Sequence, residues 1–70
     1  MPLVIAPLDT IIHVVKVNAD DKTKKHLESL GLVINSELKV TSSNGGNVII
    51  EVKGVRLALN REIAMKIYVA

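Results

Sequence analysis

Three segments in the second half of the chain alternate apolar and polar residues with the period of two that is typical of β-strands. They are ELKVT, NVIIEVK and VRLALN, which begin at Glu37, Asn47 and Val55. The loop SSNGGN and the pair Lys53-Gly54 between them supply residues that tolerate positive φ, as tight hairpin turns require. We therefore expect two adjoining hairpins of an antiparallel meander. The positions expected to face inward are Leu38, Val40, Val48, Ile50, Val52, Val55, Leu57 and Leu59.

Two further strands are predicted at either side of this meander. The run IIHVVKV at positions 11–17 is rich in β-branched residues and has no wholly polar face. It is typical of a barrel strand with one face in the core and the other partly covered by neighbouring segments. Near the end of the chain, Asn60 can cap one helical turn over 61–64, and KIYV then forms a last strand with Ile67 and Val69 inward. Five short strands with helical pieces only at the joints indicate a small closed or nearly closed β-barrel.

The first residues form an apolar segment that Pro2 and Pro7 bracket. Because proline has no N–H to donate, such a segment is limited to an edge strand or an extended arm, from which Leu3 and Ile5 can still pack inward. An edge strand such as PLVIA could pair with a neighbouring chain or exchange between chains. A weak homo-oligomer is therefore one open alternative.

The period changes to that of a helix within NADDKTKKHLESLGL, at positions 18–32. Thr23, Leu27 and Leu30 fall at i, i+4 and i+7, one of the two aspartates can cap the start, and Gly31 can end the helix. The resulting apolar stripe is narrow, which suits a helix that covers a sheet better than a helix of a bundle. One convincing α-helix is predicted.

The length of 70 residues allows at most one small domain, because chains of this size bury only about 60% of the surface exposed by the unfolded chain. We expect a single domain over residues 1–70. Ten valines and eight isoleucines against eight leucines favour a mainly β fold, and the absence of cysteine leaves an aliphatic core without disulfides.

Side chains that could perform catalysis are scattered and lack a recognisable motif. His13 lies in a predicted strand, His26 lies in the helix, and capping accounts for Asp20 and Asp21. No cluster has the spacing of a metal site, and Gly45-Gly46 lacks the following Lys-Ser/Thr and helix of a phosphate loop. The sequence predicts neither an enzyme nor a bound cofactor or metal.

The charge pattern selects no partner by itself. Nine Lys and Arg against seven Asp and Glu give a net charge of +2, and the basic residues are spread along the chain. Tyr68 is the one aromatic residue, whereas single-stranded nucleic-acid binding usually needs stacking aromatics. Nucleic acid is not an expected partner, although a nucleic-acid-binding small barrel remains an alternative. The sequence has no signal peptide and no stretch of roughly 18 apolar residues, so we expect no membrane insertion and a cytoplasmic location.

The order and spacing of these pieces resemble the FeoA family, small bacterial proteins of ferrous iron transport. The resemblance is carried by HLESLGLVINSELKV, then a Gly-containing loop, then VIIEVKGVRLALNREIAMKIYV, and so covers nearly the whole chain. None of these pieces is catalytic. Family members usually have glycine near the position of Thr10 and at the position of Asn35, and asparagine can occupy the second of these turns.

The resemblance implies an SH3-like β-barrel and an accessory, non-enzymatic function. It also implies a partner, the membrane ferrous iron transporter FeoB, through its cytosolic GTP-binding part. The chain would then work in the cytoplasm, at the inner face of the cell membrane. We expect the contact surface on the helix from Lys22 to Leu30 and on the turn from Gly31 to Ile34, where lysines flank an apolar turn. The candidate contact residues are Lys24, Lys25, Leu27, Leu30, Gly31 and Val33. For the two leucines, a place in the core is the competing interpretation.

Overall fold

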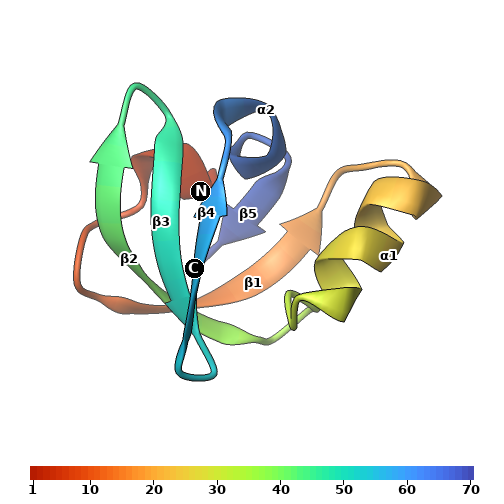
Figure 1. Ribbon diagram of the computed structural model, residues 1–70, viewed down its shortest axis with the longest axis horizontal. Coiled ribbons are helices and arrows are strands. Elements are labelled where there is room, and N and C mark those ends of the chain that lie inside the picture. The colour runs from red at the N-terminus through yellow and green to blue at the C-terminus, as the bar shows by residue number, and fades with distance from the viewer.

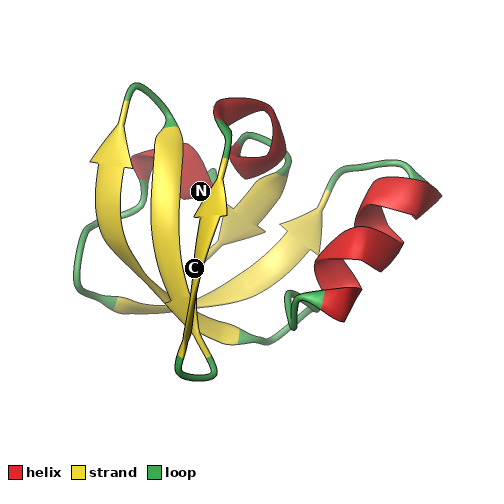
Figure 2. Ribbon diagram, in the orientation of Figure 1, coloured by secondary structure: helices red, strands yellow, loops and turns green.

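The computed structural model describes all residues from Met1 to Ala70 and consists of one curled sheet with helical segments at its joints (Figures 1 and 2). Five antiparallel strands follow the order β4-β3-β2-β1-β5, so β4 and β5 are the two edges. The fold is mainly β, as expected. The elements are η1 (Leu3–Ile5), β1 (Ile11–Val17), α1 (Asp21–Ser29), β2 (Glu37–Asn44), β3 (Asn47–Val52), β4 (Val55–Leu59), α2 (Arg61–Ala64) and β5 (Ile67–Val69).

The predicted meander is confirmed in its turns and in its register. β2 and β3 join through Gly45-Gly46, and β3 and β4 join through Lys53-Gly54. All four turn residues have positive φ, between 52° and 91°. Two-residue turns of this kind have the backbone twist that suits the twist of the flanking strands. The tight turns therefore fix which residues of β2, β3 and β4 face the interior.

The core is entirely apolar and draws on every element. Most of the positions expected to face inward are buried, but Val55 is 56% exposed and Leu57 is only half-buried. Both lie in β4, which has a neighbouring strand on one side only, so the edge position leaves them partly uncovered. The buried residues are Leu3, Ile12, Val14, Leu27, Leu32, Leu38, Val40, Val48, Ile50, Val52, Leu59, Ala64, Ile67 and Val69.

β1 forms as predicted, with Ile12 and Val14 buried, but its other face is less covered than expected. Ile11 is 58% exposed and Val15 is 48% exposed. The pairing of β1 with β5 shifts register between Val14 and Lys16, which marks a bulge at this point. Such a bulge bends a strand. The segments that were expected to cover the outer face leave these side chains in solvent.

The N-terminal segment differs from its prediction as an edge strand or extended arm. Leu3–Ile5 form a single 3₁₀ turn, in which Ile5 N–H donates to Pro2 and Ala6 N–H donates to Leu3. The turn buries Leu3 and leaves Ile5 67% exposed, although a strand would have placed both on one face. Only Pro2 and Leu8 form isolated bridges to the sheet. The segment PLVIA is therefore not an edge strand, and it offers no strand edge through which two chains could pair.

The two left-handed turns that flank the first half of the chain use residues other than glycine. Asn35 adopts a φ of 72°, as its place in the family pattern implied, and Asp9, the neighbour of Thr10, adopts 57°. Aspartate and asparagine tolerate this region better than most residues. The chain keeps both turns without the usual glycines.

No helix in the structure combines the length and the apolar character needed to cross a membrane.

Candidate functional site

The start of α1 is fixed by a side-chain cap. Asp20 has extended backbone angles, and its carboxylate accepts a hydrogen bond from Thr23 N–H at 2.8 Å. Bonds from Thr23 to the ionised form, helped by the nearby charges of Lys66 and Lys22, lower the pKa of the Asp20 carboxyl below its ordinary value. The cap satisfies one backbone donor of the first turn and fixes where the helix begins.

The end of α1 is a Schellman motif that turns the chain back along the helix. Gly31 N–H donates to Glu28, and Leu32 N–H donates to Leu27, both at 2.9 Å. Gly31 has a φ of +91°, which a residue with a Cβ rarely adopts. The motif brings Leu27 and Leu32 together as the accompanying apolar contact, and both are buried. The Leu-x-x-Leu-Gly-Leu sequence thus sets the direction of the segment that follows α1.

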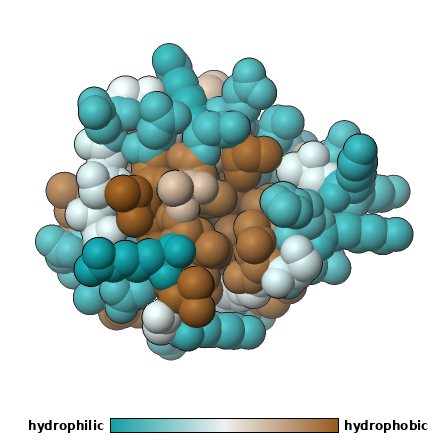
Figure 3. Space-filling model, viewed as in Figure 1, coloured by the Kyte–Doolittle hydropathy of each residue, from teal (hydrophilic) through white to brown (hydrophobic).

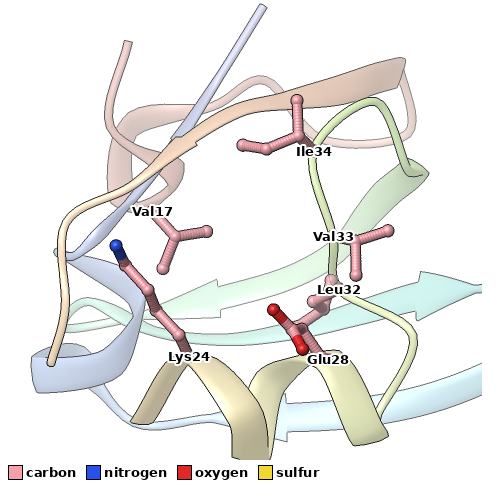
Figure 4. Close-up of a pocket in the computed structure, with 6 residues that line it drawn as sticks. All are labelled: Val17, Lys24, Glu28, Leu32, Val33 and Ile34. Atoms are coloured by element: carbon pink, nitrogen blue, oxygen red, sulfur yellow. The ribbon is translucent and has the colours of Figure 1, made fainter. Parts of the chain in front are cut away.

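This segment and α1 enclose a groove of about 350 Å³. Ser36 holds the turn in place, because its hydroxyl donates to Gly31 and accepts from Val33 N–H. Asn35 N–H and Val14 C=O, 2.7 Å apart, attach the end of the turn to β1. The apolar side chains of the groove come from β1 and the turn, and one cation and one anion come from α1 (Figure 4). Its lining residues are Val17, Lys24, Glu28, Leu32, Val33 and Ile34.

The two charged groups of the groove have no ion-pair partner within the chain, and two of its apolar side chains are exposed. Lys24 and Glu28 lie four residues apart on α1, yet neither forms an ion pair with another residue. Val33 is 42% exposed and Ile34 is 53% exposed. An apolar surface between an unpaired cation and an unpaired anion can bind a partner that offers an apolar side chain and complementary charges.

The structure divides the six candidate contact residues into surface and interior. Lys24, Lys25 and Val33 are exposed, and Leu30 and Gly31 are half-buried. Leu27 is 1% exposed and belongs to the core, the competing interpretation that the sequence left open. Lys24 and Val33 line the groove, whereas Lys25 does not.

Val17 is the groove residue that sequence reasoning did not include. It ends β1 and precedes α1, so its distance along the chain from the turn at 31–34 is large. The bonding of Asn35 to Val14 brings the end of β1 beside that turn. The only feature of the sequence that could have indicated Val17 as a groove residue is its position as an apolar residue at the end of a strand that leads into a helix. This feature is weak evidence for a surface site.

The remaining candidate chemistry stays dispersed. His13 Nε2 lies 3.4 Å from Glu37 Oε1 across β1 and β2, and both side chains are exposed. No group of three or more His, Cys, Asp or Glu side chains lies close enough together to hold a metal ion. His13 with Glu37 is a surface cross-strand pair.

The Asp20 cap makes a testable contribution to acid stability. The pKa of Asp20 is lowered on folding, so its contribution is present above the unfolded pKa and is lost as the pH falls through the folded pKa. We expect Asp20→Ala to lower the melting temperature at pH 7. Asp20→Asn should retain the cap and remove this part of the acid sensitivity, because asparagine caps helices as well as aspartate does. Thermal unfolding at pH 7 and near pH 3 measures both, and equal acid sensitivity in Asp20→Asn and the parent chain would contradict the assignment.

The fold and the groove define a class of protein: a small SH3-like β-barrel with an open apolar groove beside its helix. The family model of the FeoA domain matches residues 1–70. The chain belongs to the FeoA family.

Individual relatives agree with this assignment. The chain is 40% identical over 68 residues to a protein of Methanocaldococcus jannaschii whose name, Fe(2+) transport protein A, is provisional, and the match covers 97% of this chain and 83% of that one. A crystal structure of an iron uptake regulatory protein, FeoA, has 28% identity and a TM-score of 0.90, covering 99% of this chain and 93% of that one. The FeoA of Stenotrophomonas maltophilia, crystallised with zinc and described as an SH3 domain protein, has 28% identity and a TM-score of 0.84, covering 100% and 89%.

Proposed function

We propose that this chain is a single-domain accessory protein of ferrous iron uptake that binds the cytosolic GTP-binding part of a FeoB-type membrane transporter and modulates its activity or assembly. Membership of the FeoA family supports the link to ferrous iron transport. The Methanocaldococcus jannaschii relative bears the name of an Fe(2+) transport protein, and the Stenotrophomonas maltophilia protein is described as a candidate activating factor of ferrous iron transport. The chain would act in the cytoplasm, at the inner face of the membrane, without catalysis of its own.

The observation that carries the docking proposal is the groove beside α1. Val33 and Ile34 give an apolar anchor there, and Lys24 and Glu28 stand at its sides without partners of their own. Exposed apolar groups that become desolvated supply most of the free energy of a small interface, and flanking charges increase the rate and specificity of association. Lys25 adds positive charge next to the groove. Leu27 and Leu30 would support the surface from below.

A titration of the isotopically labelled chain with the soluble GTP-binding domain, with and without nucleotide, tests this proposal. We expect amide chemical-shift changes confined to α1, the turn 31–34 and the end of β1. The substitution Ile34→Ser should weaken binding by about tenfold, because it removes an apolar anchor. The double reversal Lys24→Glu with Lys25→Glu should weaken it as well, and more so at low salt.

Ile49→Ser is the matched control for Ile34→Ser. Ile49 is 40% exposed, lies in β3 and does not line the groove. Its substitution should leave binding unchanged. If the groove variants are folded and bind as well as the parent chain, the groove is not the docking surface. Chemical-shift changes elsewhere on the barrel would place the docking site there instead.

A further inference from the structure

Of the two edge strands of the sheet, β4 is the one whose outer side forms no backbone hydrogen bond with another segment of the chain. β5, the opposite edge, is bonded by Met1, which both donates to and accepts from Val69. β4 has β3 on one side only. In the view of Figure 1, β4 stands at the front of the molecule, and Figure 3 shows apolar surface that extends from β4 toward α1. An uncovered edge of this kind is a template for pairing with another strand.

The hydrogen-bond pattern identifies which groups on this edge are free. The two-residue turn makes Val52 and Val55 a hydrogen-bonded pair, and bonded pairs then alternate along β3 and β4. Val55, Leu57 and Leu59 thus bond to β3, and the N–H and C=O groups of Arg56 and Ala58 point outward. Neither residue takes part in any of the backbone bonds of turns, loops and caps.

These free groups are self-complementary. When two copies of β4 pair antiparallel over their full length, residues whose numbers sum to 114 lie opposite each other. Arg56 of each copy then lies opposite Ala58 of the other and exchanges both backbone bonds, giving four hydrogen bonds across a twofold axis at Leu57. A shift that placed Arg56 opposite Arg56 would set like charges face to face, which is unfavourable.

The side chains also suit this register. On the inner face, each exposed Val55 would meet Leu59 of the other copy, and the half-buried Leu57 would meet its own equivalent. On the outer face, each Arg56 lies directly opposite Glu51 of its own β3. Leu57, which the barrel core leaves half-buried, thus gains an apolar partner, whereas Val55 lies opposite a leucine that is only 6% exposed.

From this geometry we propose that the chain forms a homodimer by antiparallel pairing of β4 with β4 of a second copy, with the twofold axis at Leu57. The occupant of the edge is a second copy of this chain because one register uses all five residues of the strand, pairs every free backbone group and opposes no like charges. The interface is separate from the groove beside α1.

Backbone substitution at the free edge tests the dimer. Ala58→Pro removes one outward N–H from each copy, and the bonds to β3 remain because Ala58 does not make them. We expect the dimer dissociation constant, measured by sedimentation over a wide concentration range, to rise by about tenfold or more. Ala58→Ser keeps the N–H and is the matched control. A parent chain that stays monomeric up to about 1 mM, well above the range of specific association, would overturn the proposal.

Cross-linking gives a second test that does not depend on the proline variant. The chain has no cysteine, so a single introduced thiol reports one contact. Residues in a non-hydrogen-bonded antiparallel pair have Cα atoms about 4.5 Å apart, which permits a disulfide. L57C should therefore form a disulfide-linked dimer in a glutathione redox buffer. V55C should not, because its equivalent in the other copy lies about four strand residues away. Equal cross-linking of the two variants, or preferential cross-linking of V55C, would disprove the register. If the β4 edge bound a strand of another protein and the chain did not self-associate, the proposed dimer would be wrong and the edge would belong to another partner.

Discussion

Replacing Leu27 by alanine is expected to lower the free energy of unfolding by about 2–5 kcal/mol, the range for a buried leucine in a well-packed core. Leu27 is 1% exposed and packs with Leu32 at the Schellman end of α1. A domain of this size is stable by only about 4–10 kcal/mol. The substitution would therefore remove a large part of the total stability, and chemical denaturation followed by circular dichroism would measure it.

The Leu27→Ala variant also tests whether Leu27 acts only in the core or contacts the partner directly. Leu8→Ala is the control, since Leu8 is 51% exposed and its truncation should change the free energy of unfolding by less than about 0.5 kcal/mol. Below its unfolding transition, the Leu27→Ala variant should bind the GTP-binding domain with nearly the affinity of the parent chain. The Ile34→Ser variant should bind it about tenfold more weakly. A fully folded Leu27→Ala chain with parent stability and lost binding would mean that Leu27 contacts the partner directly.

The second large effect is expected at the N-terminal segment. Leu3→Ala should also lower the free energy of unfolding by about 2–5 kcal/mol, because Leu3 is 1% exposed and part of the single apolar core. Ile5→Ala, two residues away, should change it by less than about 0.5 kcal/mol, because Ile5 is 67% exposed. Urea denaturation of the two variants gives the comparison.

The contrast between these two substitutions distinguishes a 3₁₀ turn from a strand. In a strand Leu3 and Ile5 would share a face and would be expected to have similar effects. Similar losses in the two variants would therefore contradict the observed turn. A small loss at both positions would mean that the segment packs on the barrel without contributing to its core.

Local patterns were sufficient for most of the sheet and for α1. The alternation in β2 and β3 named their buried residues correctly, since every second side chain of a strand faces the same side and one face must be apolar. The sequence also indicated a cap at Asp20 or Asp21 and a helix end at Gly31, because both depend on residues within one turn of the helix end, and the structure shows that Asp20 is the cap. The expected family followed from the spacing of these pieces.

The residues of the candidate site could be predicted only in part from the sequence. The sequence indicated α1 and the turn at 31–34, and Lys24 and Val33 do line the groove. It could not place Val17 there, because that contact depends on how the turn bonds to β1. The sequence did place Leu27 on the apolar stripe of a helix expected to cover the sheet, and the structure confirms that Leu27 is a core residue.

The sequence by itself determined the strands, the hairpin turns and both ends of α1, because each is specified by neighbours within a few residues. Only the tertiary structure decided that Leu3 is a core residue, that Val55 and Leu57 remain partly uncovered and that one edge of the barrel is free. These properties depend on which distant segments cover a given side chain. Burial and edge exposure are set by packing between segments far apart in the chain, for which the local pattern contains no signal.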